Sequence, residues 1–398
     1  MIGPYREFFN RNFTRARYAD LLKSLAKEPL PFRVAETPVF IPADLKEQLI
    51  AAGKEIIKFI NRPDFKELTA PAIPAEWLVP NENDHPHFMA FDFGICKDDT
   101  GRLVPRLIEL QGFPSLFAFQ AHLSKAYLNT FELQQVAALT PYFNGIDDQQ
   151  YFGLLKQVIV GNHNPDQVAL MDIDATDQKT AIDFWLTAKH MGIAVLSLTD
   201  IFKEGNQLFY YRQGKKTRLK RIYNRLIFDE VGNRQALFKL SFDPREQLDI
   251  EWITHPNWFY RISKFTLPFL KNEFVPETHF LNTLNDIPAD LENYVLKPLF
   301  SFSGKGVIID ITPADLKNIS DPHNWILQRK VVYEPVIKSP DGMVKAEIRL
   351  LYIWPDGEQP QLCINLTRLS KGKMIGVSHN MDLEWVGGTI GLMDCKPS

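Results

Sequence analysis

The chain has 398 residues, of which 45% are hydrophobic and 12% aromatic. At about 150 residues per domain this length allows two or three domains, and the composition supplies enough apolar side chains for sizeable cores, which excludes a disordered chain. The 45 Lys and Arg residues nearly balance the 48 Asp and Glu residues, for a formal net charge of −3. No global field therefore draws the protein onto nucleic acid or an anionic membrane.

The three cysteines, Cys96, Cys363 and Cys395, lie far apart and form no CxxC pair, which favours a reducing compartment. The first residues, MIGPYREFFNRNF, are charged and lack the apolar core of a signal peptide. The sequence contains no run of about 18 apolar residues, the length that spans a membrane. We therefore expect a cytoplasmic protein with neither nucleic-acid nor membrane partners.

Two N-terminal segments, residues 1–30 and 43–62, repeat apolar side chains at helical spacing and are predicted to be packing helices. Residues 63–90 are rich in proline and predicted to be irregular. They include His85 and His87 in an HPH triplet. Two histidines this close can bind a metal, but no further ligands cluster beside them, so an ordinary loop is favoured.

Residues 88–119 predict a β-hairpin, with a turn at Asp98-Asp99-Thr100-Gly101. Because side chains alternate along a strand, Asp92 faces away from its apolar neighbours, and Glu109 shares its side with Gln111. Two carboxylates and an amide on one face form a hard-oxygen site suited to Mg²⁺. The alternative is a polar face exposed to solvent.

Residues 121–160 are predicted to be helical, and an α/β unit follows. It consists of a strand ending near Asp172, a helix ending at Gly192 and a second strand over 193–201. This order predicts a small parallel sheet, which binds ligands at the carboxyl ends of its strands, where Asp172 lies. The sequence has no GxGxxG dinucleotide fingerprint.

A basic run over residues 205–225 predicts a hairpin with a solvated turn, and a small anion site is the alternative. Residues 221–231 predict a strand that contains Arg225. An arginine there needs a partner if it is buried.

Residues 294–311, YVLKPLFSFSGKGVIIDI, predict a strand, a loop and a second strand. Glycines in the loop permit positive φ and let backbone N–H groups approach an anion closely, while Lys297 can place its ammonium on the same anion. A triphosphate could be held in this way. The alternative is a plain hairpin with a solvated lysine. The stretch is not a Walker loop, because the strand-GxxxxGK[ST]-helix pattern is absent.

Residues 325–335 predict a strand that leads into a connector, and residues 346–369 predict an antiparallel pair. The polar positions of that pair are Glu347, Arg349, Asn365 and Arg368. Because Lys345 and Arg349 neighbour Glu347 on one strand face, we expect a salt-bridged sheet surface there.

Four local motifs follow one another: FDF with a hairpin and ELQ-x-x-PS, SKFTLPFL, KPLFSFSGKGV, and LQRKVVYEP. They cover roughly residues 88–120 and 255–370. The set resembles the ATP-grasp superfamily, and its order resembles a circularly permuted member, the glutathionylspermidine synthetase-like group. The resemblance implies an α/β (α+β) fold that is ATP-grasp-like and circularly permuted, with N-terminal helices and a small parallel α/β (pre-ATP-grasp-like) domain.

The implied domain organisation has three parts. Residues 1–150 would hold the N-terminal helices and a metal-binding hairpin that completes the ATP-grasp site. Residues 151–235 would form the small α/β domain, and residues 236–398 the nucleotide-binding lobes.

The resemblance also implies ATP and Mg²⁺ as cofactors and assigns residues to them. The expected nucleotide-binding residues are Lys264, Lys297, Ser303, Gly304, Lys305, Gly306, Gln328 and Lys330. The expected metal ligands are Asp92, Glu109 and Gln111. Arg349 and Arg368 are expected to stabilise an acyl phosphate, and strand-face salt bridges are the alternative for both.

The implied activity is ATP-dependent ligation, in which a small-molecule carboxylate is joined to an amine or similar nucleophile through an acyl phosphate. Three positions depart from the family pattern: Gln111 stands for Asn, Ala90 for an arginine of the synthetases, and Lys305 for an arginine of the glycine loop. We expect no amidase domain within these residues. These departures favour a substrate other than glutathione, and they support the alternative of a nucleotide-binding scaffold without ligation. A third alternative is a phosphotransferase that stops at the phosphorylated substrate.

Overall fold

The computed structural model describes residues 1–227, 230, 242–301, 306–372 and 383–395. Ser303, Gly304 and Lys305 of the predicted glycine loop lie outside these ranges. In the described part of the chain, no helix combines the length and the apolar character needed to cross a membrane.

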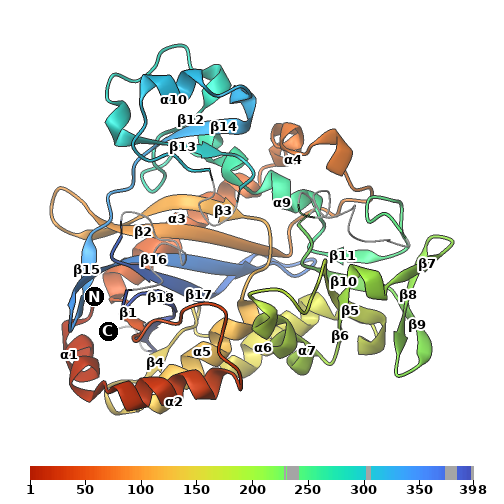
Figure 1. Cartoon of the computed structure of the whole chain (residues 1–398), viewed down its shortest axis with the longest axis horizontal. Helices are drawn as coiled ribbons and strands as arrows, with labels where there is room; N and C mark the ends of the chain where they lie inside the picture. Colours follow the sequence, from red (N-terminus) through yellow and green to blue (C-terminus); the bar gives the residue numbers. More distant parts are fainter. Residues whose placement is uncertain (228–229, 231–241, 302–305, 373–382, 396–398) are drawn as a thin grey trace.

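A six-stranded sheet occupies the middle of the molecule, in the order β18-β17-β16-β2-β3 with β15 paired to β16 (Figure 1). Its pairings are all antiparallel. The predicted hairpin is confirmed, and Gly101 turns it with a φ of +82°. The predicted pair over 346–369 is confirmed as β16 and β17. The strands are β2 (Phe88–Lys97), β3 (Leu103–Gln111), β15 (Pro335–Ser339), β16 (Gly342–Ile353), β17 (Gln361–Ser370) and β18 (Gly387–Thr389).

Helices from the N-terminal part pack against this sheet and share one large apolar core with it. Residues 1–30 form two helices, because Thr14 caps the second one by accepting a hydrogen bond from the backbone N–H of Arg17. A second small sheet, β1-β19-β4, joins the two ends of the chain. These elements are α1 (Gly3–Asn12), α2 (Arg15–Leu25), α3 (Ala43–Ile60), α4 (Phe65–Leu68), α5 (Phe117–Thr130), β1 (Val39–Phe40), β4 (Leu139–Thr140) and β19 (Gly391–Asp394).

The predicted parallel sheet is confirmed, in the order β11-β10-β5-β6. Gly192 ends α7 with a φ of +75°, as predicted. Burial raises the pKa of Asp172, at the carboxyl end of β5, to about 6. The elements are α6 (Asp148–Ile159), β5 (Val168–Asp172), α7 (Ala181–Met191), β6 (Ala194–Ser197), β10 (Arg221–Asn224) and β11 (Glu251–Ile253).

The basic hairpin forms with β7 (Phe202–Glu204), β8 (Gln207–Arg212) and β9 (Lys215–Leu219). Most of its cations pair with neighbouring carboxylates, in the pairs Lys203–Glu246, Arg212–Asp166, Lys216–Glu204 and Arg218–Asp249. These pairs are typical of a solvated surface.

The strand predicted over 221–231 is shorter than expected, because β10 ends at Asn224, whose side chain accepts a hydrogen bond from the backbone N–H of Leu226. Arg225 is buried, as the prediction allowed. Its guanidinium lies 3.6 Å from the Asp183 carboxylate and over the rings of Phe113 and Phe184. The partner that a buried arginine needs is therefore present.

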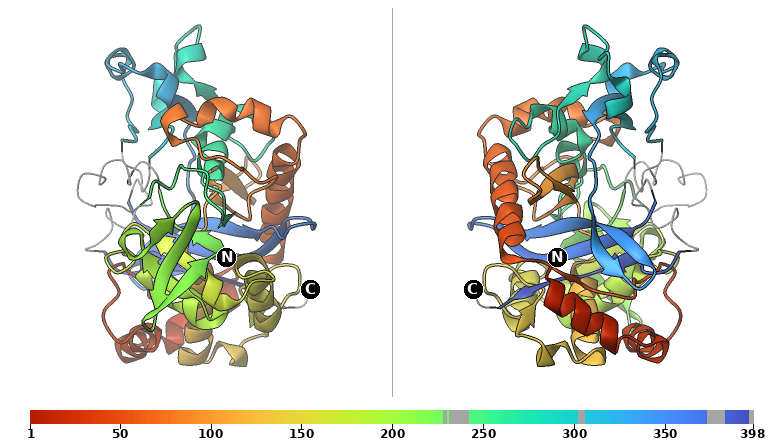
Figure 2. Two further views of the ribbon diagram at one scale, coloured as in Figure 1. Left: turned by 90° about the vertical axis from the view of Figure 1, so that its right-hand side faces the viewer. Right: turned by 90° about the vertical axis from the view of Figure 1, so that its left-hand side faces the viewer.

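A small antiparallel sheet, β12-β14-β13, stands above the central sheet in Figures 1 and 2. The prediction of a strand after the glycine loop is wrong. Residues 307–309 make one isolated bridge, between Ile308 and Leu296. In the described part of the chain, the edge of β13 that faces away from β14 therefore pairs at Leu296 alone and gains no second strand. The elements of this region are α9 (Asn257–Arg261), β12 (Thr278–Phe280), β13 (Tyr294–Pro298), α10 (Pro313–Lys317) and β14 (Trp325–Arg329).

Candidate active site

The predicted acidic face of the β2–β3 hairpin is present. Asp92 and Glu109 pair directly across the two strands, and a register shift follows at Phe93. Gln111 donates a hydrogen bond from Nε2 to Glu109 Oε1 at 3.0 Å. The side chain of Asp92 is only 1% exposed and that of Glu109 is 23% exposed, so this face is covered and is not a solvent-exposed polar surface.

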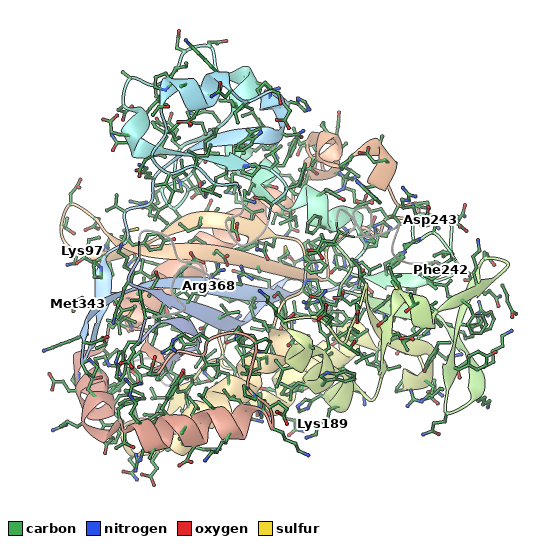
Figure 3. All side chains as sticks on the ribbon, in the orientation of Figure 1. Lys97, Lys189, Phe242, Asp243, Met343 and Arg368 are labelled. Carbon is green, nitrogen blue, oxygen red and sulfur yellow. The ribbon has the colours of Figure 1, made fainter. Side chains whose placement is uncertain are left out.

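Two arginines hold Asp92, Arg349 from the adjacent strand β16 and Arg368 from β17, so both make the strand-face salt bridges that were the alternative for them. Arg349 pairs with Asp92 in register and donates from Nη2 to Oδ2 at 2.6 Å and from Nε to Oδ1. Arg368 donates from Nη2 to the same Oδ2 at 2.6 Å. Burial by itself would raise the pKa of Asp92, but the two guanidinium groups lower it below the ordinary value. Arg368 is labelled in Figure 3, where it lies on the central sheet.

Glu347 belongs to the same buried cluster: the expected salt bridge is present, with Arg368 as the partner, but the expected surface position is wrong. The residue is 3% exposed, and its carboxylate accepts from Arg368 Nη2 and, at 3.0 Å, from the Tyr333 hydroxyl. Burial raises the pKa of Glu347. The error arose because charged neighbours on a strand face indicate exposure only when nothing covers that face.

Asn365 lies on the opposite face of the central sheet from Glu347. It pairs in register with Leu350, whereas Glu347 pairs with Arg368, and positions three apart on a strand face opposite ways. Its amide bonds to the backbone of Gly391 and Pro141. Glu347 and Asn365 therefore cannot hold one ion between them.

Lys297 joins the small upper sheet to the acidic hairpin. Its Nζ donates to Gln328 Oε1 at 2.6 Å and to the backbone carbonyl of Ile108, the residue before Glu109, at 3.1 Å. Burial lowers the pKa of Lys297 to about 8, although nearby Glu109 acts to raise it. Gln328 Nε2 is buried and, among the described residues, has no hydrogen-bond partner.

Lys264 approaches the cluster from a 3₁₀ helix, Lys264–Phe269. Its Nζ donates to the backbone carbonyl of Ser301 at 2.7 Å, and burial lowers its pKa while Glu109 opposes the shift. Lys330 is placed differently, because its Nζ pairs with Asp310 at 3.5 Å. Gly306, the described end of the glycine loop, has a φ of +77°. The structure thus joins Lys297 to the hairpin by a hydrogen bond and places Lys264 within electrostatic range of Glu109.

The cluster suits an anionic ligand better than a ready-made metal site. Two buried donors, Gln328 Nε2 and Arg368 Nε, have no partner in the described part of the chain and could donate to phosphate or purine acceptors. Asp92 and Glu109 have the hard oxygens that Mg²⁺ prefers. Yet no group of three His, Cys, Asp or Glu side chains in the described part of the chain is arranged to hold a metal ion. His85 and His87 instead both approach Asp356, at 3.1 and 3.2 Å. The assignment of Mg²⁺ ligands stays a prediction.

The sequence reasoning missed Tyr333, and Gly94 is the signal that could have indicated it. A Cβ built on Gly94 would lie 2.7 Å from the Tyr333 ring and 2.9 Å from the Val331 side chain. A glycine inside an apolar strand often marks a place where another segment approaches the backbone closely. Here that segment is the connector that carries Tyr333.

No protein-family model and no curated protein sequence matches the chain. Among solved structures, the chain is similar to a glutathione synthetase-like effector (GSS30) from Globodera pallida, solved in its apo form. The TM-score is 0.60 over 92% of this chain and 94% of that chain, at 11% sequence identity. Identity this low shows the fold alone. The chain therefore has a mixed α/β fold that is similar to that of this glutathione synthetase-like protein.

Proposed function

We propose that the protein is an ATP-dependent ligase that joins a carboxylate substrate to an amine or similar nucleophile. The observation that carries this proposal is the contact of Lys297 with the carbonyl of Ile108. This contact places the buried Lys297 ammonium, from the β12-β14-β13 sheet, beside β3 of the central sheet, the strand that bears Glu109. Cations, carboxylates and orphaned polar donors then share one buried place, as transfer of a charged phosphoryl group requires.

Each residue of the cluster has a role in this proposal. Lys297 and Lys264 would bind the phosphates of ATP, and Gln328 would use its unpartnered Nε2 beside them. Mg²⁺, held by Glu109 and Asp92 with help from Gln111, would neutralise phosphate charge when bound. The loop residues Ser303 to Gly306 and Lys330 stay proposed nucleotide-binding residues, as the resemblance implies.

The reaction would take place in two steps. An oxygen of the substrate carboxylate attacks the γ-phosphorus, which gives an acyl phosphate and ADP. The amine then attacks the acyl carbon, loses a proton and expels inorganic phosphate, so that an amide forms. Arg349 and Arg368 would stabilise the anionic acyl phosphate, and the contribution of the protein is positioning and charge neutralisation.

Circular permutation is part of the proposal. In a permuted chain the metal ligands come before the lysines, as Asp92 and Glu109 do. In the usual order they would come after, and Glu347 with Asn365 is the available pair. The opposite facing of these two side chains supports the permuted order.

Mass spectrometry of products would test the proposal. The protein is incubated with Mg²⁺-ATP and a pooled metabolite extract, and ADP is measured in parallel. We expect ADP release to depend on a supplied carboxylate, and a product whose mass equals acid plus amine minus water. ATP binding without any turnover would favour a scaffold, and a phosphorylated acid as the final product would favour a phosphotransferase. Arg349→Lys and Arg368→Lys should lower turnover without changing ATP affinity.

A further inference from the structure

The connector between β14 and β15, residues 330–334, is bonded to strand β2 of the central sheet. The backbone N–H of Glu334 donates to the carbonyl of Ile95 at 2.9 Å, and the Glu334 carboxylate pairs with Lys97 at 2.7 Å. Tyr333, the residue before, packs so closely over Gly94 that a Cβ there would come within 2.7 Å of its ring. The segment that leaves the lysine-bearing sheet is therefore held against β2.

From this position Tyr333 begins a chain of hydrogen bonds into the charged cluster. Its hydroxyl donates to Glu347 Oε2 at 3.0 Å, and the other oxygen of Glu347 accepts from Arg368 Nη2. The same Nη2 donates to Asp92 Oδ2 at 2.6 Å. Each oxygen of Glu347 thus has one donor, and the carboxylate cannot rotate without breaking one of the two bonds.

Arg368 bonds to both carboxylates through one nitrogen, and a second donor has no partner among the described residues. Both ion pairs run through Nη2, whereas Nε is buried and has no hydrogen-bond partner in the described structure. A long arginine side chain held at one end loses orientation easily, because its rotamer entropy opposes ordering. The bond from Glu347 opposes that loss and keeps the free Nε–H in one direction.

We propose that Tyr333 is a positioning residue: through Glu347 it orients the Arg368 guanidinium so that the free Nε–H can bind an anion. Within the proposed function, on which this inference rests, that anion is the acyl phosphate. Tyr333 lies on the connector that leaves the β12-β14-β13 sheet, which carries Lys297. The position of this connector against β2 and the orientation of the Arg368 guanidinium therefore depend on each other. If the connector moved away from β2, the Arg368 guanidinium would lose its fixed orientation.

The test variant is Tyr333→Phe, which keeps the ring over Gly94 and removes only the hydroxyl. Tyr211→Phe is the matched control, since Tyr211 is 65% exposed. The first measurement is exchange of the Arg368 Nε–H with water by NMR, with the signal assigned as the one lost in Arg368→Lys. We expect exchange to become about tenfold faster in Tyr333→Phe and to stay unchanged in the control. Exchange within twofold of wild type would overturn the proposal.

The second measurement tests whether Tyr333 orients Arg368 or instead lines the nucleotide-binding site. With Mg²⁺-ATP and an accepted carboxylate, kcat should fall about tenfold while the Kd and KM for ATP stay within twofold. A weaker Kd with unchanged kcat would contradict positioning. If wild type shows no turnover, the ligase proposal fails. The NMR result with inorganic phosphate as the anion then decides this inference: phosphate must shift the Arg368 Nε–H signal in wild type and shift it less in Tyr333→Phe.

Discussion

Lys297→Met should lower nucleotide affinity without lowering stability. Methionine keeps much of the apolar stem but removes the charge and the donors that reach Gln328 and Ile108. We expect ATP binding to weaken by roughly 1.5–3 kcal/mol, the scale of a charge-assisted hydrogen bond, which is about 10- to 150-fold in Kd.

The expected stability change follows from the pKa of Lys297. Burial lowers it from 10.5 to about 8, so carrying the charge costs the folded state roughly 3 kcal/mol at pH values below both. Between these two values the unfolded chain binds more protons, so the stability of wild type rises with pH. Methionine removes that cost but leaves two carbonyl oxygens without a donor, at about 1–1.5 kcal/mol each. The two terms nearly cancel, and the free energy of unfolding should change by less than about 1 kcal/mol.

Calorimetry at two pH values checks both parts. Wild-type affinity should fall as the pH rises through about 8, because the neutral amine no longer attracts phosphate. The variant should show a smaller fall, since only Lys264, whose pKa is also lowered by burial, still titrates there. Lys317→Met, at an exposed lysine of α10, is the control and should match wild type. Unchanged ATP affinity in folded Lys297→Met, or the same pH dependence in the variant as in wild type, would show that Lys297 does not bind the phosphates.

Glu109→Gln should abolish Mg²⁺-dependent turnover in a folded protein, and a phosphate-release assay that ranks Glu347→Gln as more harmful would contradict the proposed ligands. Asp92→Asn should lower the free energy of unfolding by roughly 3–5 kcal/mol in urea, because it breaks a buried ion-pair network. The two arginines lower the pKa of Asp92 below its ordinary value of 3.8. The difference in unfolding free energy between wild type and Asp92→Asn should therefore shrink as the pH falls below 3.8, and a difference independent of pH would contradict this role of the Asp92 charge. Gly94→Ala should destabilise by about 1–3 kcal/mol, because its Cβ would overlap the Tyr333 ring. Gly153→Ala in α6, with open space around it, should stabilise by about 0.5–1 kcal/mol; equal midpoints of thermal unfolding for the two variants would count against this packing.

Local signals in the sequence were sufficient for the two strands of the acidic hairpin and for its turn at Asp98–Gly101. They did not predict the register shift between Asp92 and Phe93, which places Asp92 across from Glu109 where the register of the turn alone would place Ile108. The same local logic predicted the parallel α/β unit and the end of its helix at Gly192. These features depend on neighbours within a few residues, so sequence alone determined them.

Tertiary structure decided which faces are buried and which charges meet. Glu347 has charged neighbours on its strand, yet it is buried because the connector with Tyr333 covers it. Residues 307–309 have strong strand propensity, but strand pairing needs a partner edge, and only Ile308 finds one. The contact of Lys297 with Ile108 spans 189 positions and requires two sheets to dock. Such contacts depend on the packing of whole elements, which no local pattern encodes.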